Sequence, residues 1–305
     1  MATIAQSNVS SAKAASCFGG EVKEYLWSWQ GQQLQIVYET LGQGTPVLLL
    51  PAFSTVSTRG EMATLAELLS AQFQAVAVDW PGFGGSSRLP LDYQPALYHQ
   101  FLQDFVKGVF NTPVAVVAAG HAAGYVMQLA NAQPSVFSKV VLAAPTWRGP
   151  LRVMGVKPQI AGTVRQAVRS PVLGQALYKL NTTPSFLRYM YKSHVYSDSA
   201  KLTPDFIQQK WEVTQQPGAR FAPAAFVTGN LDPVEQQADF LALFQPLPVP
   251  VLVAIGEQSP PRSRAEMDAM AVPGVESRLL PGTLGLHEEY ATQLAEVVLP
   301  FLSTT

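Results

Sequence analysis

The sequence lacks the residues that several common classes of protein require. A single cysteine, Cys17, among 305 residues excludes an internal disulfide framework and any metal site built from several cysteines. The four histidines (His99, His121, His194 and His287) are scattered without a pair at metal-ligand spacing, so we expect no bound metal. The net charge is −1 and no basic run occurs, which argues against a nucleic-acid partner.

Long apolar runs are also missing. No segment reaches the roughly 18 uninterrupted apolar residues of a membrane span. Residues 1–20 are small and polar and lack the apolar core of a secretory signal. We therefore expect a disordered tail over residues 1–20, no membrane span and a cytoplasmic location. The composition, 48% hydrophobic and 13% charged, permits a large buried core.

After the tail, strand and helix patterns alternate. Alternating apolar residues around Gly31 predict a hairpin of residues 25–29 and 34–39. Short apolar runs predict buried strands, and periodic segments between them predict helices. The strands are expected at 47–50, 74–79, 114–119, 139–144, 251–255 and 276–280, and the helices at 61–71, 96–110 and 288–301. This order predicts a parallel sheet with right-handed crossovers.

Residues 145–246 interrupt this alternation. They carry helical patterns near 160–180, 185–191, 204–214 and 221–228, with many aromatic residues. We predict a helical cap at 145–246, inserted into a core formed by residues 21–144 and 247–305. A cleft between cap and sheet would suit an apolar small molecule, whereas no protein partner can be specified.

The turn after the expected strand 114–119 carries a family resemblance. Its sequence, Gly120-His121-Ala122-Ala123-Gly124, resembles the nucleophile elbow G-x-S-x-G, in which the central residue is held in a strained conformation. The loop from Asp79 to Ser86 is similar to a recurrent D-x-P-G-F-G-x-S loop. Both features are typical of cap-bearing members of the α/β-hydrolase family. The elbow is also similar to that of uncharacterised hydrolase-like proteins of photosynthetic organisms.

The resemblance implies a fold and a set of site positions. The fold is an α/β-hydrolase fold, a mostly parallel eight-stranded sheet flanked by helices with an inserted helical cap. The nucleophile position is Ala122, whose methyl group cannot attack a substrate. The acid position, three residues after Gly256, is Ser259, although the neighbouring Glu257 is an alternative acid.

The position of the general base departs from the family pattern as well. Alignment on the last helix places Leu284 there, and alignment on Pro281-Gly282 places Gly285 there. His287 matches neither alignment but remains the candidate base if the loop is re-routed.

Backbone N–H groups do not depend on the side chains that are missing from the triad positions. The resemblance implies an oxyanion-binding or anion-binding site made by the N–H groups of Phe53 and Ala123. We expect a ligand cleft lined by Phe53, His121, Ala122, Trp147 and Tyr189, with no cofactor.

Three interpretations remain open. The first, which we favour, is a non-catalytic protein with a degraded triad that binds a ligand or partner in the cleft. The second is a serine-type hydrolase or esterase, inactivated at Ala122 or working through Glu257 and His287. The third is a non-hydrolytic enzyme of the same fold, such as a lyase or a cofactor-free oxygenase, with His287 as its base.

Overall fold

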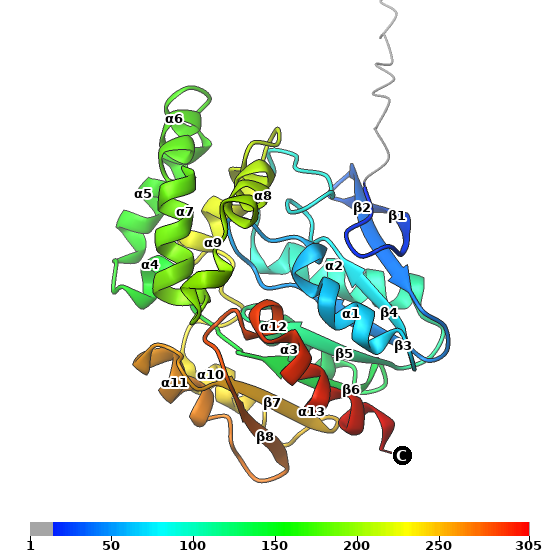
Figure 1. The fold of residues 1–305 in the computed structure, drawn as a ribbon. Coiled ribbons are helices and arrows are strands. Elements are labelled where there is room, and N and C mark those ends of the chain that lie inside the picture. Colours follow the sequence, from blue (N-terminus) through cyan, green and yellow to red (C-terminus); the bar gives the residue numbers. More distant parts are fainter. Residues whose placement is uncertain (1–14, 305) are drawn as a thin grey trace, which may run out of the picture.

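The computed structural model describes residues 15–304, which form one eight-stranded sheet (Figure 1). The strand order is β1-β2-β4-β3-β5-β6-β7-β8; β2 is antiparallel to β1 and β4, and all other neighbouring pairs are parallel. This arrangement confirms the predicted fold class. The strands are β1 (Glu21–Trp29), β2 (Gln32–Leu41), β3 (Pro46–Leu50), β4 (Gln74–Val78), β5 (Val114–Ala119), β6 (Phe137–Ala143), β7 (Val251–Gly256) and β8 (Val275–Leu280).

The central strands are apolar because helices cover both faces of the sheet. Strands β5 and β7 are buried at every position. Helix α1 (Ala63–Leu69) packs against α13 (Ala291–Ser303) in front of the sheet in Figure 1, and α2 (Pro95–Val109) packs against α3 (Ala122–Ala132). Three short helices complete the core: the 3₁₀ helix η1 (Arg59–Met62), α11 (Pro261–Asp268) and α12 (Leu286–Glu289).

The interval between β6 and β7 contains helices and no strand, and we call residues 145–246 the helical insertion. The single helical pattern expected over 160–180 is two helices, because Pro171 lies between them and cannot continue the first. Figure 1 shows the first helices of the insertion standing beside the sheet. Its elements are α4 (Pro150–Val153), α5 (Pro158–Arg169), α6 (Leu173–Leu180), α7 (Pro184–Met190), η2 (Tyr191–Val195, a π-helical turn), η3 (Ser199–Lys201), α8 (Pro204–Thr214), α9 (Phe221–Val227) and α10 (Gln237–Ala242).

The predicted tail is attached to the core over its last residues. The buried carboxylate of Glu39 accepts hydrogen bonds from the Ser16 hydroxyl at 2.6 Å and from the N–H groups of Cys17, Phe18 and Gly20. The expectation of a disordered tail is therefore wrong for residues 15–20, because their amides satisfy a buried charge. The rest of the predicted tail, residues 1–14, lies outside the described residues.

No helix within residues 15–304 is long and apolar enough to cross a membrane.

Candidate functional site

The turn between β5 and α3 is the reference point of the site. The residue with left-handed backbone there is Gly120, at φ +52°, whereas His121 has ordinary helical angles and Ala122 is the first residue of α3. The expectation that Ala122 holds the strained central position is wrong by two residues. Glycine adopts positive φ without steric cost, which explains why the bend falls at Gly120.

The surroundings of Gly120 indicate where a reactive side chain would stand. A Cβ atom built on Gly120 would lie 3.1 Å from Cβ of Ala52, in the loop after β3, and 3.8 Å from Oγ1 of Thr146, in the loop after β6. The residue at the bend is thus aimed between two loops at the carboxyl edge of the sheet. Because it is a glycine, no attacking atom is present at this place.

The predicted oxyanion donor Ala123 is already engaged. Its N–H donates to the carbonyl of Gly120 at 3.2 Å, closing the first turn of α3. This amide therefore does not point a free hydrogen toward a ligand. The side chain of Phe53, in the other predicted donor residue, is buried against the ring of Trp80, with ring centroids 4.8 Å apart.

The predicted cleft above the turn is filled with protein. Phe53, His121 and Ala122 are all buried, and Phe226 of α9 lies over them: its ring is edge-on to His121 at 5.1 Å and stacked on Phe53 at 6.4 Å. Tyr189, expected in the same cleft, is 61% exposed on α7. An aromatic residue of the insertion, Phe226, thus packs against two of the residues that the sequence placed in an open cleft.

Both ring nitrogens of His121 contact the helical insertion, one near its first residues and one near its last. Its Nδ1 lies 3.1 Å from Oγ1 of Thr146, and its Nε2 lies 3.0 Å from Oδ1 of Asp232. Asp232 also accepts hydrogen bonds from the N–H of Gly149 at 2.7 Å and from Arg152 at 2.8 Å. When Nε2–H donates to Asp232, Nδ1 is left to accept from the Thr146 hydroxyl, so the tautomer is set by the carboxylate.

Sequence reasoning missed this hydroxyl–imidazole–carboxylate series. His121 was predicted only as a lining residue, and Asp232 lies 111 positions farther along the chain. A local signal existed only for Thr146, which lies in the loop after β6, next to Pro145.

The predicted acid and base do not meet. Glu257 is exposed at the end of β7, and Ser259 is buried with its hydroxyl unpartnered among the described residues. His287 is buried on α12, and its Nε2 lies 3.3 Å from Oε2 of Glu61 on η1. The hypothesis that Glu257 and His287 pair is therefore wrong, because η1 supplies the carboxylate instead.

His287 belongs to a second buried polar cluster between α12, η1 and α8. Lys210 of α8 bonds Glu288 at 2.7 Å. Burial would by itself lower the pKa of Lys210, but the carboxylates of Glu288 and Glu61 raise it overall. Burial raises the pKa of Glu61, although His287 and Lys210 oppose this shift. The cluster is an interlocked charge network that fixes α8 of the insertion against the core.

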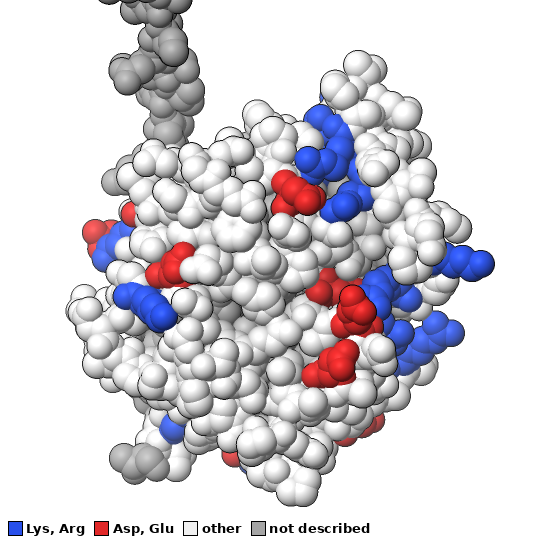
Figure 2. Space-filling view, turned by 180° about the vertical axis from the view of Figure 1, so that it is seen from behind, with Lys and Arg blue, Asp and Glu red and all other residues white. Residues whose placement is uncertain are grey.

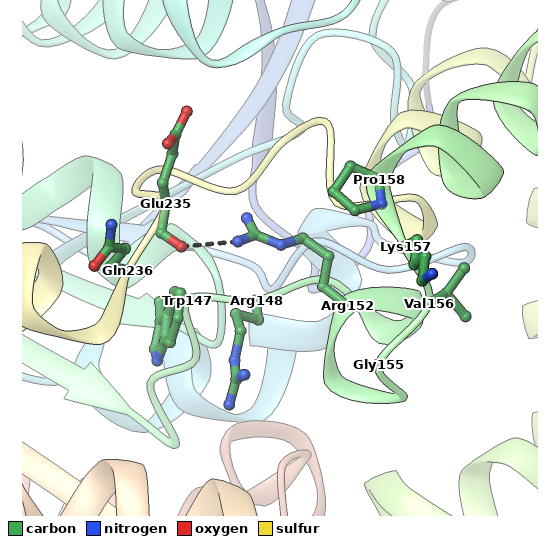
Figure 3. Close-up of a pocket in the computed structure, with 9 residues that line it drawn as sticks. All are labelled: Trp147, Arg148, Arg152, Gly155, Val156, Lys157, Pro158, Glu235 and Gln236. Carbon is green, nitrogen blue, oxygen red and sulfur yellow. Dashed lines mark hydrogen bonds between the residues drawn. The ribbon is translucent and has the colours of Figure 1, made fainter.

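An open cavity of about 480 Å³ lies at the base of the helical insertion (Figure 3). It combines apolar surface with cationic groups: the Arg148 guanidinium lies 4.5 Å from the Trp147 ring, and Arg152 reaches the carbonyl of Glu235 at 2.8 Å. Trp147 is the one predicted cleft residue that lines it. The full lining is Trp147, Arg148, Arg152, Gly155, Val156, Lys157, Pro158, Glu235 and Gln236.

Comparison with known proteins identifies relatives of this architecture. The model of the "Alpha/beta hydrolase family" matches residues 47–297. No match is found among curated proteins.

Similar solved structures cover nearly the whole chain. A probable hydrolytic enzyme from Pseudomonas aeruginosa PAO1 superposes with a TM-score of 0.72 at 16% identity, covering 94% of this chain and 96% of that one. A thermophilic esterase from Thermogutta terrifontis gives 0.71 at 17% identity (92% and 98% covered). A bromoperoxidase from Bacillus anthracis gives 0.70 at 18% identity (92% and 100%). At these identities the likeness establishes the fold alone.

Proposed function

The chain belongs to the α/β-hydrolase family, and we propose that it is a non-catalytic member that binds a ligand instead of hydrolysing one. The observation that carries this proposal is Gly120: the residue at the bend of the elbow has no side chain. Covalent catalysis by this fold needs a nucleophile at that bend, with a base and an orienting acid in series.

The other two triad positions support the same conclusion. The acid position is Ser259, a neutral side chain, and the base position by alignment is Leu284 or Gly285. The nearest imidazole in sequence, His287, is held by Glu61 in the second buried polar cluster. Phe226 packs edge-on against His121, the residue that follows the bend, with ring centroids 5.1 Å apart.

We place ligand binding in the cavity at the base of the helical insertion. Its lining pairs the indole of Trp147 and the side chains of Val156 and Pro158 with the cations of Arg148 and Lys157. Arg148 is paired with Glu266, whereas Lys157 is exposed and has no ion-pair partner within residues 15–304. A small organic anion with a flat apolar body fits this combination best.

A second candidate function has one observation in its favour. Thr146, His121 and Asp232 form a hydroxyl–imidazole–carboxylate series, which is the order of groups that activates a hydroxyl nucleophile. Thr146 is partly exposed and lies beside the bend at Gly120. We rank a threonine-dependent hydrolase second because Asp232 is also bound by Gly149 and Arg152, an arrangement suited to anchoring the insertion.

Catalysis is tested with a fluorophosphonate probe and with p-nitrophenyl acetate. The wild-type protein should remain unlabelled and should release p-nitrophenol at the rate of buffer alone. Saturable turnover that persists in Cys17→Ala and disappears in Thr146→Val would overturn the non-catalytic proposal in favour of the second candidate.

Ligand binding is tested with 8-anilinonaphthalene-1-sulfonate, an aromatic anion. We expect saturable fluorescence enhancement that weakens several-fold in Lys157→Gln and is unchanged in Lys107→Gln, a control lysine exposed on α2. Equal binding to both variants would remove the cavity from the proposal.

A further inference from the structure

The helical insertion carries a one-sided distribution of charge. No aspartate or glutamate occurs between Asp104 and Asp198. Within that interval, residues 148–192 hold eight basic side chains, although the whole chain has 20 Lys and Arg against 21 Asp and Glu. The eight are Arg148, Arg152, Lys157, Arg165, Arg169, Lys179, Arg188 and Lys192.

Five of these eight cations form no ion pair with a carboxylate within residues 15–304. Arg148, Arg152 and Arg165 form ion pairs with carboxylates elsewhere in the chain, and Arg169 donates to the Leu91 carbonyl. The remaining four are exposed and have no ion-pair partner in the described part of the chain: Lys157, Lys179, Arg188 and Lys192. In Figure 2, which views the molecule from behind, several Lys and Arg lie along the side that the insertion occupies, with some Asp and Glu next to them.

The same segment exposes most of the large apolar side chains that reach solvent. Eight of the eleven such residues found within 15–304 lie between positions 154 and 189. They are Met154, Ile160, Val164, Val172, Leu173, Leu180, Phe186 and Tyr189. Scattered single apolar residues are ordinary on a protein surface, but a concentration in one segment indicates an interaction site.

Helical spacing places these side chains on outward faces. Ile160 and Val164 are four residues apart on α5, and Phe186 and Tyr189 are three apart on α7, so each pair shares one face. Val172, 84% exposed, lies in the connection between α5 and α6. Figure 1 shows α5, α6 and α7 on the side of the insertion away from the sheet.

We propose that this outward surface of α5, α6 and α7 docks on an anionic lipid bilayer. Exposed apolar side chains beside unpaired lysines and arginines are the composition of interfacial helices, which bury the former among acyl chains and place the latter at phosphate groups. The inference goes beyond ligand binding in the cavity and stands independently of it. An acidic protein would match the charge but would leave the exposed side chains of Val172 and of Leu173, the first residue of α6, without a role.

The test is co-sedimentation of the full chain with vesicles. We expect binding to phosphatidylcholine vesicles that contain 30% phosphatidylglycerol, and much weaker binding to phosphatidylcholine alone. Lys179→Gln with Arg188→Gln should lower the partition coefficient about 25-fold, at about fivefold per charge. The matched control is Lys107→Gln with Arg278→Gln. It removes the same amount of charge from exposed positions outside the helical insertion and should have no such effect.

The apolar contribution is tested with Val172→Ser plus Leu173→Ser, with thermal melting of each variant as a folding check. This double variant should also lose most of its binding to the anionic vesicles. Absence of wild-type binding, or an equal loss in the charge control, would overturn the proposal. Binding that depends on charge but not on Val172 and Leu173 would overturn it too, and would favour an acidic macromolecular partner.

Discussion

Nε2 of His121 lies 3.0 Å from Oδ1 of Asp232, and this contact joins the elbow of the sheet to the far end of the helical insertion. Both side chains are buried, and the carboxylate is shared with Gly149 and Arg152. The residue that follows the bend at Gly120 thus holds two parts of the chain together.

Breaking this contact should destabilise the protein strongly. Asp232→Ala leaves His121 and Arg152 without their buried partner, and we expect a loss of about 3–5 kcal/mol in the free energy of unfolding. Urea denaturation measures this change. Asp268→Ala, which removes an exposed pair with Arg264 on α11, should cost less than about 1 kcal/mol. Similar losses in the two variants would contradict the anchoring role.

Gly120→Ala should be more harmful than a substitution at an open left-handed glycine. Alanine at either Gly120 (φ +52°) or Gly31 (φ +78°) meets the backbone penalty of roughly 1–2 kcal/mol. Only at Gly120 would its Cβ also press on Ala52, at 3.1 Å, since nothing lies within 4 Å at Gly31. We expect thermal melting to show the larger shift for Gly120→Ala. An equal shift in melting temperature for the two variants would mean that the loop after β3 can move away from the new Cβ at little cost in free energy.

Ala122→Ser should not create a nucleophile. Ala122 is fully buried in the first turn of α3, two residues after the bend at Gly120. We expect no fluorophosphonate labelling, measured by intact-protein mass. Rapid labelling of this single variant would show that a working base reaches position 122 after all.

The ionisation of the Glu39 carboxylate should make the free energy of unfolding depend on pH under acidic conditions. Burial alone would raise its pKa, but hydrogen bonds from Ser16, Cys17, Phe18 and Arg59 lower it below its ordinary value of 4.5. The folded state therefore binds the proton less readily than the unfolded state. The stabilisation is fully present above pH 4.5 and is lost as the pH falls through the folded-state pKa.

The comparison that isolates this effect is wild type against Glu39→Gln. At pH 7 we expect the variant to be less stable by about 3 kcal/mol, because Arg59 loses a charged partner. The difference in unfolding free energy should shrink below pH 4.5. Glu257→Gln, at an exposed carboxylate, is the control and should show no such trend. A difference that stays constant with pH would rule out the charge of Glu39 as the cause.

Some elements were predictable because their signals are local. The apolar run of β5 and the segment of α8 that follows Thr203 were predicted with the bounds that the structure has. Buried runs bounded by glycine and proline determine where strands begin and end, whatever the rest of the chain does. The alternation of such segments determined the parallel sheet and its helical insertion.

The site depended on contacts that no local pattern encodes. The bend fell at Gly120, which adopts positive φ without steric cost, while the sequence motif centred it on Ala122. His287 found Glu61, 226 positions away, instead of the nearby Glu257.

Sequence by itself determined the order and kind of the elements, and with them the absence of a nucleophile: neither glycine nor alanine at the elbow can attack. Tertiary structure alone decided which polar groups meet, because side-chain pairing depends on how distant loops converge at one edge of the sheet. The contact of His121 with Asp232 and the packing of Phe226 against His121 are both consequences of that convergence.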